Sequence, residues 1–245
     1  MVKRRLVITD LTYMWDDEVC IAGVDREGNC VRPLTPEGVR RSHLFRDGQL
    51  MLYPGALVEF DLSPVDVVMP PHIEDQYFEP FATANIVDCS EAQWERILKR
   101  GCFASIEEMF DGYLEGDRRV PPDADTRSLG TLCSPKATGV WVDESYGRRQ
   151  FRLDFVDGSG RAHKGYPVND LAFRTFLQSR IDALGDKDEA SNAVLGALQS
   201  AERMYLRVGL ARPRPMGAYP TACWTQITGI YTFPDYLGGR TFADF

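Results

Sequence analysis

Residues 18–34, EVCIAGVDREGNCVRPL, consist of two apolar runs separated by a charged turn. Both runs have the composition of short strands, and Gly28 supplies a residue that tolerates a positive φ between them. The second run carries Arg32 directly before Pro33, which favours an extended backbone at the arginine. The stretch therefore predicts a β-hairpin at the start of a β-barrel, and it raises the question of what Arg32 does there.

Further strands are predicted by alternation of apolar and polar residues. They are expected near the N-terminus and at residues 56–62, 85–89, 138–143, 149–156, 161–168, 204–210 and 225–232. In the clearest case Phe151, Leu153 and Phe155 share one face, while Arg152 and Asp154 share the other. Such strands bury one side and leave the other polar.

Helices are predicted where capping residues precede an apolar periodicity. The expected helices cover residues 35–44, 91–100, 105–114, 170–184 and 188–201. Ser90 is the expected N-cap of the second, and Gly101 its stop. Thr35 followed by Pro36 resembles the opening of the first.

The order of these elements predicts a β-rich α+β fold: two small OB-like β-barrels in tandem with inserted and connecting helices. The first barrel is expected at residues 1–115 and the second at 131–245. Residues 116–130 are charged, contain prolines and lack periodicity, which is typical of a linker. Because long βαβ alternation is absent, a Rossmann-type domain is not expected.

The 245 residues carry a net charge of -8, which argues against a protein that coats DNA nonspecifically. A local basic groove is still compatible with that charge. Arginine clusters at 40–41 and 118–119 are interpreted as solvated surface, whereas those at 148–152 and 207–214 lie beside predicted strands and could line a concave patch.

Six cysteines without a paired Cys-x-x-Cys spacing are interpreted as small buried apolar residues. Three histidines stand far apart, so neither a metal site nor a cofactor is expected. No apolar stretch is long enough for a membrane helix. The basic start has an apolar run of only three residues before Thr9, which predicts a first strand and a cytoplasmic protein rather than a signal peptide.

Several short motifs resemble the dual OB-fold domain family. VCIAGVD at 19–25 and VRPL at 31–34 look like the family's CVAG and WIRP segments. PHIE at 71–74 looks like its histidine loop, and YPVND at 166–170 like its YLPVTD phrase. Cys30 departs from the pattern, since an aromatic residue is commoner there.

This resemblance implies tandem OB folds, binding of nucleic acid or nucleotide-like ligands, and an association with bacterial defence or mobile-element systems. It implies no catalytic mechanism. The shared positions that match are Cys20, Gly23, Arg32, Pro33, His72, Arg152 and Asp170.

The candidate nucleic-acid-binding residues are Arg32, His72, Trp141, Arg149, Arg152, Lys164 and Arg207. Arg32 is either an ordinary strand residue or a donor to phosphate or a base edge. His72 is either a hydrogen-bonded loop residue or an acid–base group beside Glu74. Trp141 is either core or a stacking surface.

The C-terminal 23 residues are rich in aromatic side chains, so they are expected either to close the second barrel or to dock onto a partner protein. The leading functional hypothesis is an accessory protein that binds single-stranded nucleic acid or a nucleotide. The alternative is a protein-interaction or scaffold module. An enzyme ranks third, because the sequence shows no nucleophile–base set and no metal-ligand spacing.

Overall fold

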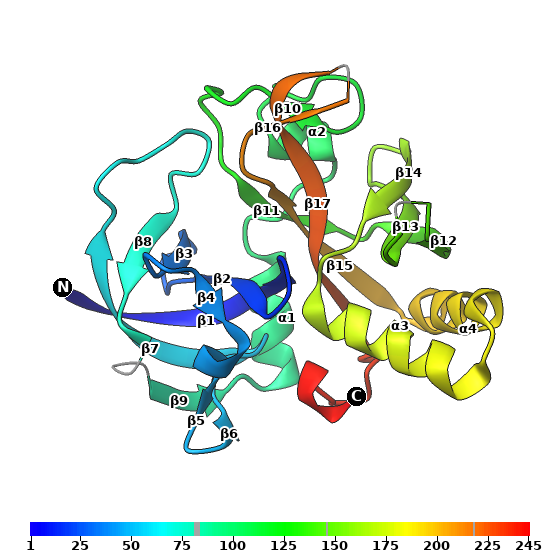
Figure 1. Cartoon of the computed structure of the whole chain (residues 1–245), viewed down its shortest axis with the longest axis horizontal. Helices are drawn as coiled ribbons and strands as arrows, with labels where there is room; N and C mark the ends of the chain where they lie inside the picture. Colours follow the sequence, from blue (N-terminus) through cyan, green and yellow to red (C-terminus); the bar gives the residue numbers. More distant parts are fainter. Residues whose placement is uncertain (81–83, 146, 218) are drawn as a thin grey trace. The chain divides into compact units, whose positions relative to one another are not determined.

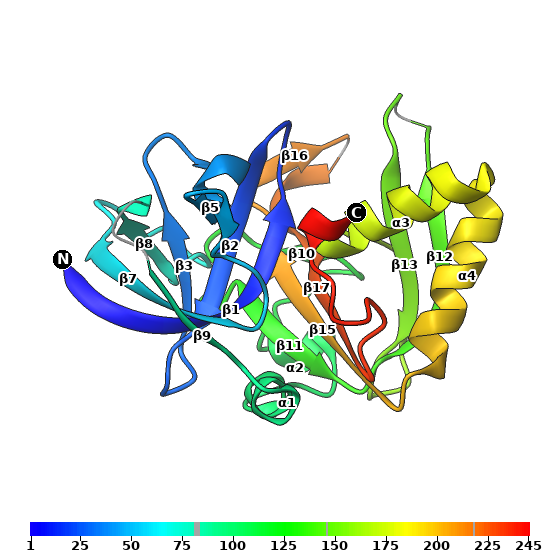
Figure 2. The same cartoon turned by 90° about the horizontal axis from the view of Figure 1, so that it is seen from below.

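The computed structural model describes residues 1–80, 84–145, 147–217 and 219–245. The chain divides into two compact units, Met1–Gly101 and Cys102–Phe245. Strands dominate both units, and the two longest helices, α3 (Leu171–Leu184) and α4 (Lys187–Ser200), belong to the second (Figures 1 and 2). The protein is therefore a β-rich α+β chain, as predicted.

Five strands of the first unit form a closed ring. In spatial order they are β1 (Val2–Tyr13), β2 (Glu18–Val24), β3 (Cys30–Leu34), β8 (Asp75–Phe78) and β7 (Ala56–Pro64), and β7 pairs again with β1. The pair β3–β8 is parallel, and the other pairs are antiparallel. The hairpin predicted at residues 18–34 is confirmed as β2 and β3 of this barrel.

The ring closes because the two halves of β1 pair with different neighbours. Val2 through Val7 pair with β7, and the rest of the strand to Tyr13 pairs with β2. Val7 pairs with both neighbours, and a register shift follows between Ile8 and Asp10 in the pairing with β2. Such a bulge bends and twists a strand, which a small barrel requires.

The core of the first barrel follows the predicted alternation in β7. Val58, Phe60 and Leu62 are buried, and the ring of Phe60 packs edge-to-face on Phe78 at 5.4 Å. β9 (Ala84–Asp88) pairs with the edge of β7 that lies opposite β1. The acidic residues between the apolar ones lie on the opposite side of the strand, as the period of two requires.

Helix α1 (Glu91–Lys99) begins and ends where the sequence predicts. The Ser90 hydroxyl accepts a hydrogen bond from the Gln93 amide at 3.4 Å, and the Gln93 side chain bonds back to Ser90. Gly101 follows with a φ of +67°, a conformation that favours glycine.

The helix predicted at residues 35–44 is wrong. The segment contains a turn, β4 (Val39–Arg40) and the 3₁₀ helix η1 (Arg41–Leu44), followed by the short hairpin β5 (Phe45–Arg46) and β6 (Gln49–Leu50). Gly38 has a φ of +82°, which is incompatible with a continuing helix, and Val39 pairs with Val19 of β2. Tertiary pairing therefore overrides the local capping signal.

The second unit contains two separate hydrogen-bonded sheets in its described part. One has the order β10 (Arg119–Val120), β17 (Tyr219–Phe233), β15 (Arg203–Leu210) and β11 (Leu129–Cys133), with β16 (Arg214–Met216) on β17. The other has the order β12 (Lys136–Asp143), β13 (Gln150–Val156) and β14 (Ala162–Pro167). An isolated parallel bridge, Val168 with Ile227, follows β14.

The C-terminal segment after β17 packs on helix α3. The ring of Phe176 contacts Tyr236 at 5.8 Å and Phe245 at 5.1 Å. Arg240 lies over the Phe245 ring at 4.5 Å. The aromatic tail thus packs within its own unit.

The division between the units lies at Gly101, whereas the sequence predicts a linker at residues 116–130. The predicted linker contains β10, which pairs with β17, and Leu129 and Gly130 at its end pair with β15. These pairings make the whole segment part of the second unit. The predicted helix at 105–114 shortens to α2 (Ile106–Met109).

Among the six cysteines that the sequence predicts to be small buried residues, Cys223 is a buried free thiol, whereas Cys20, Cys30 and Cys89 are only partly buried. Cys102 and Cys133 form a disulfide that joins the start of the second unit to the end of β11. Their 31-residue separation gave no motif from which to predict the pairing. Among the described residues, no helix is both long and apolar enough to cross a membrane.

Candidate nucleic-acid interface

The three-stranded sheet β12–β13–β14 presents a polar outward side. Phe151, Leu153 and Phe155 of β13 are buried, which places Arg152 and Asp154 on the opposite side, as predicted. Trp141 is 40% exposed. We call the outward side of this sheet, with Trp141, Arg152, Asp154 and Lys164, the Trp141 face.

Trp141 lies across the sheet instead of standing away from it. It is paired with Arg152 on β13, yet its indole Nε1 donates to the Asp154 carboxylate at 3.2 Å. The ring extends as far as Gly165 of β14, where a Cβ atom would stand 3.0 Å from Trp141 Cζ2. The indole is thus fixed at its edge while much of its surface stays in solvent.

Asp154 stands where the ladders on both of its sides are irregular. In the pairing with β12 the register skips a residue between Ala137 and Gly139. In the pairing with β14 two residues, Lys164 and Gly165, stand opposite Asp154 alone. A β-bulge of this kind leaves one backbone amide outside the regular ladder. The Gly165 amide donates to the Asp154 carboxylate at 2.6 Å, so a side chain satisfies it.

Three donors share the Asp154 carboxylate: the Trp141 indole, the Gly165 amide and the Lys164 ammonium at 3.2 Å. Partial burial raises the pKa of Asp154, but these hydrogen bonds and the charge of Lys164 outweigh it. The pKa of Asp154 is therefore lower than usual. Asp154 stays ionised and holds Trp141 in place.

Gly165 is required at its position for two reasons. Its φ of +61° lies in the region that L side chains rarely adopt, and the indole occupies the space of a Cβ atom. Gly139 flanks Asp154 on the other side, where a Cβ would meet the carboxylate at 3.1 Å. The two glycines give the carboxylate and the indole their room.

Arg118 is a member of the site that sequence reasoning missed. Its guanidinium donates to the carbonyl of Lys164 and lies over the Tyr166 ring at 5.0 Å. Burial lowers the pKa of Arg118, and the nearby positive charge of Arg152 adds to this effect. Within the described residues Arg118 forms no ion pair with a carboxylate. The arginine pair at 118–119 was the available signal, and it was interpreted as solvated surface.

The other predicted cations of this unit form ion pairs around the Trp141 face. Arg152 contacts Asp143 at 3.2 Å and is mostly buried, whereas Lys164 on β14 is 69% exposed. Arg149 is exposed and pairs with Glu144 at 3.0 Å. The structure thus brings Trp141, Arg152 and Lys164 together and places Arg149 at the end of the same sheet.

The remaining three predicted residues lie elsewhere. Arg32 is buried in the first unit, and its Nη1 atom lies 3.0 Å from the Asp75 carboxylate. His72 is also buried in that unit, in the loop before β8. Arg207 on β15 is buried and donates to the Thr131 hydroxyl at 3.0 Å. The opening question therefore has a structural answer: Arg32 neutralises a carboxylate on the adjacent parallel strand.

No group of three or more histidine, cysteine, aspartate or glutamate side chains in the described part of the chain is arranged to hold a metal ion. The chemistry that the Trp141 face offers is noncovalent. It combines an exposed ring with cationic donors.

No family model matches this sequence, and a search of curated proteins finds no match either. The resemblance to the dual OB-fold domain family therefore stays a prediction.

Proposed function

We propose that this protein binds nucleic acid through the Trp141 face of its second unit. The observation that carries the proposal is the indole of Trp141, which is held against the sheet by Asp154 and Gly165 and is still 40% exposed. An exposed large aromatic ring that is fixed in one orientation can stack on a base without a large loss of side-chain entropy.

Cations surround this ring on the same unit. Arg118 and Arg152 lie beside it, and the Lys164 ammonium is its most exposed charged neighbour. These groups are spaced along β13, β14 and the segment before β10, so phosphates on either side of a stacked base would find a cation. Because carboxylates already accompany Arg152 and Lys164, binding is expected to be moderate and to weaken with salt.

The fold supports the proposal by analogy. We propose that both units are OB-type barrels, the second with its first strand divided into β11 and β12. The ring of the first unit has five strands, and in the second unit β12, β13 and β14 are followed by a parallel bridge to β17. OB folds bind oligonucleotides on the face of strands 2 and 3, which would correspond to β13 and β14.

The scaffold alternative receives less support. The aromatic C-terminal segment expected to dock onto a partner protein packs on α3 of its own unit through Tyr236 and Phe245. The membership in a dual OB-fold family and a role in bacterial defence or mobile-element systems stay part of the proposal, since they rest on the motifs alone.

The proposal is tested by fluorescence-anisotropy titration with labelled single-stranded DNA, single-stranded RNA and duplex DNA at two salt concentrations. Trp141→Ala is expected to weaken single-strand binding by about 1–3 kcal/mol, the usual contribution of a base stacked on an aromatic ring. Lys164→Gln is expected to weaken binding less and to reduce the salt dependence.

Matched controls come from the same chain. Tyr113 is also 40% exposed in the second unit, and Lys99 is an exposed lysine of α1. Tyr113→Ala and Lys99→Gln should leave binding unchanged. If the folded protein binds none of the three nucleic acids at low salt, the proposal is wrong.

A further inference from the structure

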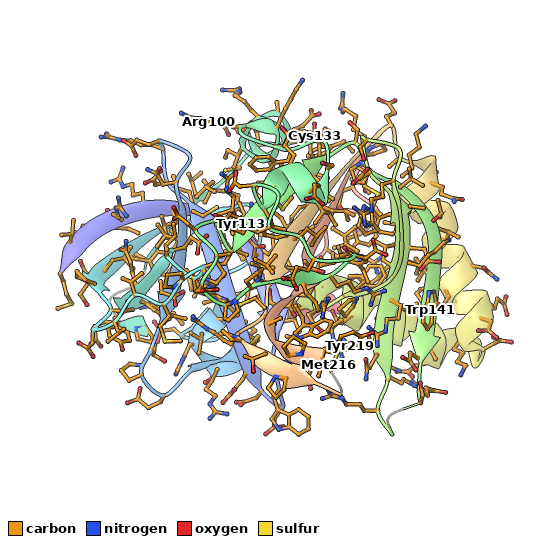
Figure 3. All side chains as sticks on the ribbon, turned by 90° about the horizontal axis from the view of Figure 1, so that it is seen from above. Arg100, Tyr113, Cys133, Trp141, Met216 and Tyr219 are labelled. Atoms are coloured by element: carbon orange, nitrogen blue, oxygen red, sulfur yellow. A yellow bond between two sulfur atoms is a disulfide. The ribbon has the colours of Figure 1, made fainter. Side chains whose placement is uncertain are left out.

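A second exposed ring lies on the same unit as Trp141. Tyr219, at the start of β17, is 57% exposed, and it is paired with Met216 of β16, which is 40% exposed (Figure 3). The Tyr219 ring packs edge-to-face on Trp224 at 5.7 Å, and the Arg119 guanidinium lies over it at 4.9 Å. Like Trp141, this ring is held by neighbours and remains accessible.

Arg118 forms hydrogen bonds both beside Trp141 and on the strand that carries Tyr219. The Arg118 side chain donates to the Lys164 carbonyl on β14, next to Gly165 and the Trp141 indole. Its backbone carbonyl accepts the Thr225 amide of β17 at 2.9 Å. Arg119 then pairs with Trp224 in the β10–β17 ladder. Two consecutive arginines therefore extend from the Trp141 face to Tyr219.

The two arginines differ from most other cations of this surface in their partners. Arg118 has no carboxylate partner among the described residues, and Arg119 reaches Glu115 only at 3.8 Å. Arg152, Arg149 and Lys164 each have a carboxylate at 3.0–3.2 Å. Arg118 and Arg119, between the two rings, are thus cations without a carboxylate at hydrogen-bonding distance among the described residues.

We infer that the ligand is a single-stranded polynucleotide that spans both rings, with one base on Trp141, another on Tyr219, and the intervening phosphates on Arg118 and Arg119. This inference rests on the proposed function and goes beyond it, because it selects a strand over a mononucleotide or a duplex. Bases in a duplex are already stacked on each other, so either ring could stack on them only after neighbouring base pairs are unstacked, which costs a few kcal/mol per step.

The test is a length series of labelled oligothymidylates of two, four, eight and twelve nucleotides, with matching oligouridylates and one duplex. Affinity should rise with length until the strand contacts both rings and then level off. Tyr219→Ala should weaken binding of the eight-nucleotide strand roughly fivefold or more and leave the two-nucleotide ligand nearly unchanged. Tyr219→Phe retains the ring and should restore binding, and Tyr113→Ala, at another exposed tyrosine of the unit, is the control.

The outcomes separate this inference from the proposed function. If Trp141→Ala weakens binding but Tyr219→Ala does not, or if two nucleotides bind as tightly as eight, the proposed function holds and the two-ring path is wrong. Equal affinity for duplex and single strand would also overturn the path. If no oligonucleotide binds the native protein, both proposals fail.

Discussion

Arg32 of the first unit lies in an environment opposite to that of Arg149 and Lys164 in the second, although Arg207 of the second unit is buried as Arg32 is. In the first unit Arg32 of β3 is buried and paired with Asp75 of the parallel strand β8. In the second, Arg149 and Lys164 stay exposed around a tryptophan. All three were candidates for the same role by sequence. Residue type alone therefore does not determine whether such a cation is buried in a pair or stays at the surface.

A second difference concerns the strand that begins each sheet. In the first unit β1 runs unbroken from Val2 to Tyr13 and pairs with both neighbours. In the second unit Ser134, whose φ is +48°, and Pro135 separate β11 from β12, so β11 pairs with β15 and β12 with β13. The division leaves β12–β13–β14 as a sheet with its own outward side.

The comparison of cations predicts the largest effect for Arg32. Arg32→Met removes the guanidinium from a buried carboxylate, and breaking such a buried pair is expected to cost about 3–5 kcal/mol of unfolding free energy. Arg149→Met breaks an exposed pair and should cost at most about 1 kcal/mol. Urea unfolding of both variants measures the difference. Equal losses would contradict the contrast between the units.

The disulfide gives a second test of the difference between the two units, because among the described residues it lies in the second unit alone. Reduction should lower the stability of that unit by about 3–4 kcal/mol, from the loop of 31 residues that the bond closes. Cys133→Ser should reproduce the loss without reductant. Cys89→Ser, at a cysteine outside the disulfide, is the control and should have little effect. Hydrogen exchange resolved by unit would show whether the loss is confined to residues after Cys102.

Gly165 tests whether the Trp141 face depends on its bulge. Gly165→Ala combines a strained positive φ, which costs roughly 1–2 kcal/mol, with a clash against the indole. Gly160 has a φ of +85° with no atom within 4 Å of the added Cβ, so Gly160→Ala carries the same strain alone. Both variants should lose stability, the Gly165 variant more, and only the Gly165 variant should change tryptophan fluorescence and weaken nucleic-acid binding. A change in both would mean that the clash is unimportant.

The smallest expected effect is the pH dependence that Asp154 contributes. Since the pKa of Asp154 is lower in the native state than in the unfolded chain, the unfolded chain binds the proton more readily. Its contribution to stability is present above about pH 4 and is lost as pH falls through the native pKa. Asp154→Asn should flatten the stability–pH curve in this range, whereas Asp66→Asn, on an exposed loop of the first unit, should not. An unchanged curve would contradict the role of Asp154.

Elements that depend on local sequence signals could be predicted from the sequence. The hairpin of β2 and β3, the capped helix α1 and the alternation of β13 follow from turn glycines, a serine cap and a period of two. The same alternation placed Arg152 and Asp154 on one side correctly. For these elements the preference of each residue agrees with the fold around it.

The roles of several other residues depend on tertiary contacts. Arg32 acquires its partner from a strand more than forty residues later, and the Cys102–Cys133 pairing has no local motif. The helix expected at residues 35–44 yields to pairing with β2. Arg118 becomes part of the Trp141 face because a bulge at Gly165 exposes a carbonyl of β14 to it. Each of these outcomes depends on contacts between distant parts of the chain, which a local pattern of residues does not encode.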